Sequence, residues 1–219
     1  MKFFLAVCLL LNISTGCGNN SKDVQKSELA NAAPVEVPTQ NGLKKAYFAS
    51  GCFWCVEAIY ESVKGVKEAV SGYAGGHTKN PTYKLSNTGT TGHAEAVEVI
   101  YDPKIVDFAT LVDVYFGSQN PTQENGQGPD IGSQYRSIIF YQNEEQKEII
   151  ERKKAELRDK LGEPIAAELM PFQKFWKAED YHQDYEKLHP DDPYIQNVSV
   201  PRINRFKRKF PELLKENSH

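Results

Sequence analysis

Short strand patterns alternate with helical patterns through most of this 219-residue chain, and that alternation limits its fold more than any other feature. The strand patterns occupy residues 44–50, 66–73, 93–101, 134–141 and 165–170. The helical patterns occupy residues 52–64, 107–117 and 143–161. This order predicts an α/β fold of the α+β type. We expect a two-layer α/β sandwich with a ferredoxin-like βαββαβ core, an added helix and strand, and a C-terminal extension.

Charge and cysteine content narrow the functional classes. The formal net charge is -3, so we expect no nucleic-acid partner. The chain has four cysteines, which are too few for a disulfide scaffold. A zinc site would need two ligands besides Cys52 and Cys55, and no histidine lies in a paired ligand motif, so we expect no metal. No coiled-coil pattern occurs, and we predict a monomer.

The N-terminus has the pattern of a targeting signal. Lys2 precedes the apolar run 3–11, which is too short to span a membrane and has the length of a signal-peptide core. The small residues before Cys17 resemble a bacterial lipobox, so we predict a signal peptide over residues 1–16 and lipidation of Cys17. Plain secretion is the alternative. The predicted location is the bacterial cell envelope, lipid-anchored and periplasmic or extracytoplasmic.

Two segments flank the predicted catalytic domain, which covers residues 43–190. Residues 17–42 are polar and lack aromatic side chains, so we expect a flexible tether. Residues 191–219 form the C-terminal extension. They hold a basic cluster, which we interpret as a solvated face, with contact to anionic lipid as the alternative. The cluster consists of Arg202, Arg205, Lys207, Arg208 and Lys209.

Two cysteines lie where a strand pattern turns into a helix pattern. Free N–H groups and the helix dipole favour a thiolate at Cys52. Cys55 follows one helical turn later, on the same face. A C-x-x-C at a helix start is typical of redox chemistry, whereas a lone cysteine is usually a small core residue. Phe53 and Trp54 between them are either core residues or an apolar wall beside the nucleophile.

These residues belong to a longer resemblance. Residues 51–54 (GCFW), followed by Glu57, resemble the active-site signature of the A-type peptide methionine sulfoxide reductases. Further blocks resemble that family in the same order: 72–76 (GYAGG), 80–83 (NPTY), 92–97 (GHAEAV), 101–103 (YDP), 132–137 (GSQYRS) and 178–183 (AEDYHQ). The resemblance covers roughly residues 46–190.

The resemblance implies a chemical role for several side chains. Cys52 would attack the sulfoxide sulfur, and Glu95 would supply the proton that the departing oxygen needs. A carboxyl group keeps its proton near neutral pH when its surroundings are apolar. Tyr83 and Tyr135 would donate hydrogen bonds to the same oxygen, as in an oxyanion hole.

The resemblance also implies how the substrate is held. Phe53 and Trp54 would hold the methyl group of methionine sulfoxide, and Asp130 would be a further polar residue lining the site. His93 and His182 match the family pattern as well, and we interpret them as structural hydrogen-bonding residues. Without the resemblance, the carboxyl and the tyrosines are more simply read as solvated or packing residues.

Closing the catalytic cycle needs a second thiol or an external one. Many members of the family have glycine at the position of Cys55 and resolving cysteines in a C-terminal tail, whereas this chain has no cysteine after Cys55. Our hypothesis is that Cys55 resolves the Cys52 sulfenic acid as a disulfide, which a thioredoxin-like dithiol then reduces, without a bound cofactor. Direct reduction by an external thiol, with Cys55 as a packing residue, is the alternative.

The family resemblance implies reduction of methionine S-sulfoxide, in proteins and as the free amino acid. Two other functions stay open at this point. One is a general C-x-x-C thiol–disulfide oxidoreductase, which does not need Glu95 or the tyrosines. The other is a module that only binds a methionine-rich partner.

Overall fold

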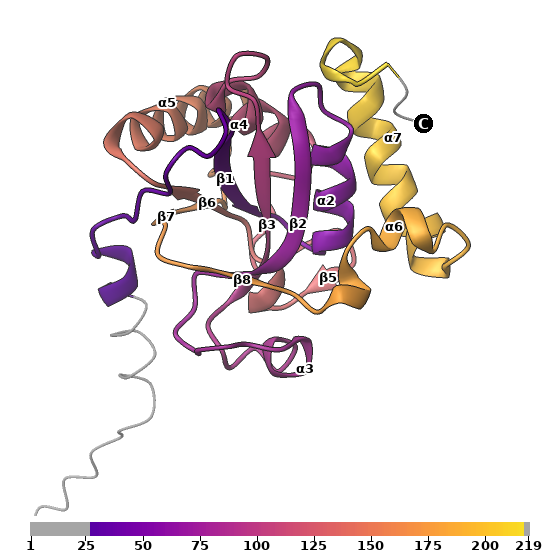
Figure 1. Ribbon diagram of the computed structural model, residues 1–219, viewed down its shortest axis with the longest axis horizontal. Coiled ribbons are helices and arrows are strands. Elements are labelled where there is room, and N and C mark those ends of the chain that lie inside the picture. Colours follow the sequence, from indigo (N-terminus) through magenta and orange to yellow (C-terminus); the bar gives the residue numbers. More distant parts are fainter. Residues whose placement is uncertain (1–26, 217–219) are drawn as a thin grey trace, which may run out of the picture.

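A six-stranded β-sheet organises residues 27–216, the part of the chain that this computed structural model describes (Figure 1). Its strand order is β7-β6-β1-β3-β2-β8. The strands are β1 (Lys44–Ala49), β2 (Val66–Ala74), β3 (Ala94–Tyr101), β6 (Ile138–Tyr141), β7 (Glu168–Pro171) and β8 (Phe175–Lys177). Neighbouring strands are antiparallel, except that β6 and β7 are parallel.

Four of these strands form the predicted ferredoxin-like core. They lie in the order β6-β1-β3-β2, and α2 (Phe53–Glu61) and α4 (Phe108–Gly117) connect them as crossovers. Because β3 lies between β1 and β2, the first β-α-β unit is split in the way that this core requires. β7 and β8 extend the core at its two edges. The expected fold class is therefore confirmed.

Besides α2 and α4, the helices are α3 (Tyr83–Ser86), α5 (Glu144–Leu161), α6 (Tyr185–Leu188) and α7 (Val200–Lys209). The four longer helices, α2, α4, α5 and α7, share one buried cluster with one face of the sheet. The cluster joins Phe48, Val97 and Val99 of the sheet to Ile59, Leu111, Ile150 and Phe206 of α2, α4, α5 and α7. Asn143 caps α5 by accepting a hydrogen bond from the Gln146 N–H, as the sequence predicts. The sulfur-bearing end of α2 is thus held between sheet and helices.

The opposite face of the sheet is covered by a smaller apolar cluster. The ring of Phe172, just after β7, stacks on Tyr47 of β1 with centroids 3.8 Å apart. Ala96 of β3 and Phe140 of β6 lie in the same cluster. β3 is therefore buried on both faces along much of its length, although its alternating pattern predicts a half-buried strand.

The tether predicted over residues 17–42 is shorter than expected at its domain end. The Val35 N–H donates to the Phe172 carbonyl, and the Val37 N–H donates to the Gln142 side-chain oxygen, each at 2.8 Å. Val37 also packs against the smaller apolar cluster. Backbone hydrogen bonds hold this stretch, which a count of aromatic side chains does not detect. The prediction of a flexible tether is wrong from Val35 onward.

The other N-terminal predictions concern residues outside the described range. The signal peptide over residues 1–16 and the lipidation site at Cys17 both lie there. Within residues 27–216, no helix has both the length and the apolar character needed to cross a bilayer.

The two long loops between the core elements contain short structures of their own. The loop before β3 contains α3. The loop after α4 contains a two-stranded ladder of β4 (Gly126–Gln127) and β5 (Asp130–Ile131), and then the turn η1 (Ser133–Tyr135). Strands β6 and β7 begin later than their apolar patterns predict, at Ile138 and Glu168. These loops carry several of the predicted site residues.

The C-terminal segment, residues 180–216, packs on the domain and is not a detached extension. The segment contains η2 (Asp180–His182), the π-helical turn η3 (Ile195–Ser199), α7 and η4 (Pro211–Leu213). Arg202, Ile203 and Phe206 lie on one face of α7 and are buried. Placing Arg202 on a solvated basic face is therefore wrong, whereas Arg205, Arg208 and Lys209 are exposed. The helical spacing of one basic and two apolar residues turns Arg202 inward.

Candidate active site

Cys52 lies at the tight turn that joins β1 to α2. Gly51 has φ +78°, and a side chain there would meet the Cβ atom of Gln127 at 2.6 Å, so glycine is required. Cys52 is the N-terminal flanking residue of α2 and is 6% exposed. Free backbone N–H groups at this helix end favour negative charge on the sulfur. The predicted placement of Cys52 at a strand-to-helix junction is confirmed.

The second cysteine follows one helical turn after the first. Cys52 and Cys55 are both reduced, and each thiol alters the pKa of the other. The hydroxyl oxygen of Tyr194 lies 3.9 Å from the Cys55 sulfur and donates a hydrogen bond to the Asp130 carboxyl at 2.6 Å.

The two thiols have pKa values displaced in opposite directions. Burial raises the pKa of the Cys52 thiol, and the neighbouring Cys55 thiol adds to the increase. The predicted preference for a thiolate at Cys52 is therefore wrong for the resting site, because burial outweighs the N–H groups of the helix start. The Cys52 thiol, helped by the Arg202 guanidinium, lowers the pKa of Cys55 to about 6 although that thiol is buried.

Glu95 extends from β3 to the start of α2. Its carboxyl oxygen accepts a hydrogen bond from the Phe53 N–H at 3.0 Å. The side chain is buried, and burial raises its pKa to about 8 against the opposing effect of that hydrogen bond. Asp130 and Cys55 add to the increase through their negative charges. The carboxyl is therefore protonated at neutral pH, as a proton donor to a departing oxygen must be.

Three further predicted residues converge on these groups from separate loops. Tyr83 comes from α3, Asp130 from β5 and Tyr135 from η1. Burial raises the pKa of both phenols, and the charges that Glu95 and Cys52 can carry add to this increase. Burial also raises the pKa of Asp130, against the Tyr194 hydrogen bond. The structure thus brings together all the residues predicted to act on the oxygen.

Phe53 and Trp54 differ in their surroundings. Phe53 is 1% exposed, with its ring centroid 4.9 Å from that of His182. Trp54 is partly exposed and stacks on Tyr185 with centroids 3.7 Å apart. Its indole N–H donates to the His182 Nδ1 at 3.2 Å, so the ring is fixed at both ends. Trp54 is therefore the more accessible of the two rings, while Phe53 is fully buried.

The two histidines have the structural environments that we predicted. His93 accepts from the Gly76 N–H at 3.0 Å and contacts the Thr78 carbonyl at 2.8 Å. His182 is wedged among aromatic rings and accepts from Trp54. Burial lowers the pKa of both imidazoles. Both rings are therefore neutral supports of neighbouring segments.

Sequence reasoning missed the contribution of the C-terminal segment. Tyr194, Ser199 and Arg202 all affect the pKa of Cys55, and the Tyr194 hydroxyl oxygen lies 3.9 Å from its sulfur. The sequence separation between Cys55 and Tyr194 is 139 residues, so no local pattern links them. The one available signal was the helical spacing of Ile203 and Phe206, which marks α7 as a packed helix.

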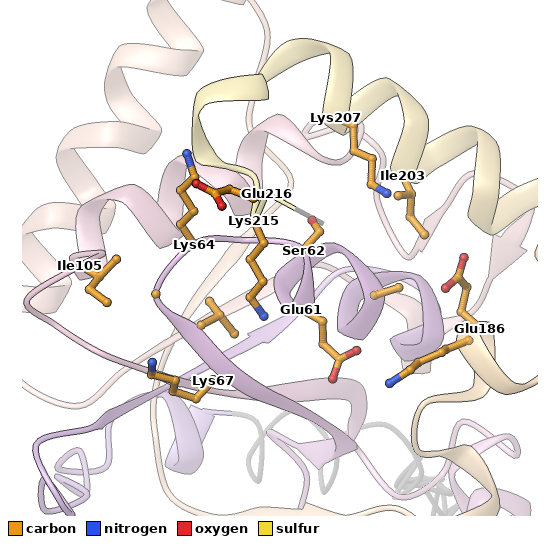
Figure 2. Close-up of a pocket in the computed structure, with 14 residues that line it drawn as sticks. Glu61, Ser62, Lys64, Lys67, Ile105, Glu186, Ile203, Lys207, Lys215 and Glu216 are labelled. Carbon is orange, nitrogen blue, oxygen red and sulfur yellow. The ribbon is translucent and has the colours of Figure 1, made fainter. Parts of the chain in front are cut away.

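An open groove of about 1010 Å³ lies at the other end of α2 and contains none of the predicted site residues (Figure 2). Ala58, Glu61 and Ser62 of that helix end form part of its wall. The charged residues around it are Glu61, Lys64, Lys67, Glu186, Lys187, Lys207, Lys215 and Glu216. It has no cysteine and mixes both signs of charge. We therefore place the chemistry at the buried end of α2 and not in this larger hollow.

A cluster of three carboxyl groups lies beside the groove. Glu57, Glu61 and Asp184 have oxygens within 4.8 Å of one another. One Glu57 oxygen accepts from the Ser71 hydroxyl and the other accepts from the Asp184 N–H. Because both oxygens are engaged, the contacts of Glu57 explain it as a structural link between α2, β2 and the C-terminal segment.

Fold and site together define a class of protein. A reduced dithiol at a helix start, next to a protonated carboxyl group and two phenols, is suited to transferring two electrons from sulfur to an oxidised substrate while protonating a leaving oxygen. The class is that of thiol-dependent oxidoreductases.

Comparison with known proteins identifies the family. A model of the family "Peptide methionine sulfoxide reductase" matches residues 44–214. The chain is 48% identical over 172 residues to the peptide methionine sulfoxide reductase MsrA of Pasteurella multocida, covering 78% of this chain and 99% of that protein. It is 46% identical over 170 residues to MsrA of Thermus thermophilus, covering 78% and 97%.

Solved structures agree with this result. The reduced form of Mxr1 from Saccharomyces cerevisiae has a TM-score of 0.67 at 32% identity, covering 71% of this chain and 91% of that one. Methionine sulfoxide reductase A of Corynebacterium diphtheriae has a TM-score of 0.63 at 35% identity, covering 74% and 84%.

The chain therefore belongs to the peptide methionine sulfoxide reductase family, and it is an oxidoreductase of the MsrA type. The family match continues past residue 190, the predicted end of the catalytic domain. This agrees with the packing of α7 against α2.

Proposed function

We propose that this protein reduces methionine S-sulfoxide, in proteins and as the free amino acid, with Cys52 as the nucleophile. The observation that carries the proposal is the protonated Glu95 carboxyl at the start of α2, which is held by the Phe53 N–H. A general disulfide reductase needs only the dithiol. A buried acid beside the dithiol favours a reaction in which an oxygen atom leaves.

The first half of the reaction forms methionine. Cys52 passes its thiol proton to the neighbouring Cys55 thiolate and attacks the sulfoxide sulfur, while Glu95 donates a proton to the oxygen as the S–O bond weakens. Tyr83 and Tyr135 donate hydrogen bonds to that oxygen and stabilise its developing negative charge. Asp130 lines this polar side of the site, while Phe53 and Trp54 hold the substrate methyl group. The oxygen then passes to the Cys52 sulfur, the bond between the Cys52 and substrate sulfurs breaks, methionine leaves, and Cys52 becomes a sulfenic acid.

The second half regenerates the dithiol. Cys55 attacks the sulfenic sulfur of Cys52, so that a disulfide forms and water leaves. An external dithiol of the thioredoxin type then reduces the disulfide by exchange. The spacing of one helical turn between the two thiols, and the effect of each on the pKa of the other, support Cys55 as the resolving residue. All electrons pass through sulfur, and the proposal includes no bound cofactor or metal.

A second proposal concerns the location of the enzyme in the cell. We infer from the N-terminal signal that Cys17 carries a lipid and anchors a monomeric enzyme in the bacterial cell envelope, on the extracytoplasmic side. Mass spectrometry of the membrane-associated protein tests this, because a lipidated N-terminal peptide beginning at Cys17 is expected. Recovery of an unmodified Cys17 peptide from the soluble fraction would indicate plain secretion.

A turnover assay with separate epimers tests the activity. Peptides that contain methionine S-sulfoxide or methionine R-sulfoxide are incubated with the enzyme and dithiothreitol, and methionine is quantified. We expect product from the S epimer alone. Insulin reduction, measured in parallel, should be much slower. Fast insulin reduction with no methionine formed would support the general thiol–disulfide oxidoreductase instead.

A further inference from the structure

We propose that Arg202 is a positioning residue that holds Cys55 as the thiolate required to resolve the Cys52 sulfenic acid. The proposal rests on the resolving role given to Cys55 above. It assigns a function to the C-terminal helix, which carries no cysteine in this chain.

Arg202 is a buried cation with neutral partners. Its guanidinium donates to the Ser118 carbonyl at 2.9 Å, to the Ser50 carbonyl at 2.9 Å and to the Ser50 hydroxyl at 3.0 Å. The residue is 6% exposed. No carboxylate within residues 27–216 forms an ion pair with it. A positive charge in such surroundings stabilises any anion that can form nearby.

Cys55 is the group placed to become that anion. α7 packs against α2, and Arg202 holds Ser50 two residues before Cys52. The Tyr194 hydroxyl oxygen lies 3.9 Å from the Cys55 sulfur and donates to the Asp130 carboxyl. The Cys52 thiol, Ser199 and Arg202 also influence Cys55, and Glu95 lies in its electrostatic range. Among these groups, only Arg202 carries a permanent positive charge. The Cys52 thiol lowers the pKa of Cys55 most and the field of Arg202 lowers it further, whereas burial raises it.

A thiolate at Cys55 matters in the resolving step, because the thiolate and not the thiol is the nucleophile. The Cys55 sulfur attacks the sulfur of Cys52–S–OH. The S–S bond forms, the S–O bond breaks, and hydroxide leaves as water with the proton that Cys55 gave up. Two thiols thus supply the two electrons that reduced the sulfoxide, and no further oxidant or reductant takes part.

Two substitutions separate the charge of Arg202 from its hydrogen bonds. Arg202→Gln keeps donors for the serine carbonyls but removes the charge, and Arg202→Lys keeps the charge. Arg205→Gln is the matched control, because Arg205 lies exposed on the same helix. The pKa of Cys55 is measured in a Cys52→Ser background by the ultraviolet absorbance of the thiolate. Circular dichroism melts verify that each variant is folded.

We expect Arg202→Gln to raise the Cys55 midpoint by about one pH unit or more, while Arg202→Lys and Arg205→Gln leave it near the parent value. In otherwise unsubstituted protein at about pH 6.5, disulfide formation after one turnover should slow by about tenfold in Arg202→Gln, and raising the pH should restore the rate. An unshifted midpoint, or a slow step that higher pH does not rescue, would overturn the proposal and leave Arg202 as a structural clamp. Formation of one equivalent of methionine in the same experiment reports on the proposed function separately.

Discussion

The two ends of α2 differ in their exposure to solvent and in the side chains that surround them. The N-terminal end is closed and aromatic, and it contains Cys52 next to one buried acid. The C-terminal end opens into the lysine-lined groove of Figure 2. The dithiol and Glu95 both lie at the buried end. Burial shifts the pKa values of thiols and carboxyls there, whereas solvent at the open end screens the charges.

Glu95 and Glu57 are both buried acids, but they differ in how many of their carboxyl oxygens accept hydrogen bonds. Burial raises the pKa of Glu95 to about 8 and of Glu57 to about 7. Glu57 accepts from the Ser71 hydroxyl and the Asp184 N–H, so both of its oxygens are used. Glu95 accepts only from the Phe53 N–H within the described residues. A buried acid with an unused oxygen can act on a substrate, and one with two engaged oxygens holds the fold together.

The largest effect should come from the sulfurs themselves. Cys52→Ser should abolish methionine formation, because the serine hydroxyl is a far weaker nucleophile toward sulfur than the thiol it replaces. Cys55→Ser should still yield one equivalent of methionine and then stop with a thioredoxin-type reductant. Rapid-quench analysis of methionine and mass spectrometry of the trapped protein measure both. A Cys55→Ser variant that turns over normally with that reductant would show that Cys55 is a packing residue.

The comparison of the two acids is tested by matched amide substitutions. Glu95→Gln should slow single-turnover methionine formation by about 10²–10⁴-fold, because the amide cannot protonate the departing oxygen. Glu57→Gln removes a hydrogen-bond acceptor that serves the fold, so its rate should change by less than about tenfold while its melting temperature falls. Equal loss of rate in the two variants would contradict the division of roles.

The pH dependence of Glu95 should be visible in both rate and stability. Single-turnover methionine formation should decline as the pH rises through about 8, where the acid form is lost. The folded pKa lies above the unfolded value, so this group's contribution to stability is full below about pH 4.3 and is lost as the pH rises to about 8.

The stabilising effect of Glu95→Gln relative to the parent should therefore grow across that interval, by about 1.4 kcal/mol for each unit of the pKa shift. Thermal melts at several pH values measure it. A constant difference between the two proteins would mean that Glu95 ionises normally in the folded state.

The smallest effect is expected at the open end of α2. Lys67→Ala alters the charge of the groove without touching the dithiol or Glu95. Methionine formation and disulfide formation should both stay within about twofold of the parent rates, because exposed charges at that distance are screened. A large loss of activity with short peptides would show that the groove takes part in the reaction.

The core of the fold was accessible from sequence because its signals are local. The alternation in β3 and the capping side chain of Asn143 each lie within a few residues, and the β-α-β order implies the ferredoxin-like sheet. β8 has three residues, which is too short for a periodic signal. The two-residue strands β4 and β5 are also too short for a periodic signal, so the sequence predicts only a loop there.

The site residues could be predicted from the sequence only in part. Cys52 and Cys55 are separated by one helical turn, so their spacing alone indicates a dithiol. Glu95, Tyr83 and Tyr135 were identified through the family resemblance, since nothing local distinguishes them from other acids and phenols. Arg202 meets Ser50 across 152 residues of sequence, and three basic residues that follow it, Arg205, Arg208 and Lys209, are exposed. Its burial is a property of tertiary packing.

The way the chain ends has a practical consequence. The Lys64 N–H donates to the Leu213 carbonyl, and the Lys215 N–H donates to the Ser62 carbonyl, so the last described turn is fastened to the segment after α2. Near the start of the described residues, the Val35 N–H donates to the Phe172 carbonyl. A fragment for expression or labelling should therefore run from before Val35 to beyond Lys215. Affinity tags belong outside both limits, because trimming either end would release hydrogen bonds on which the domain closes.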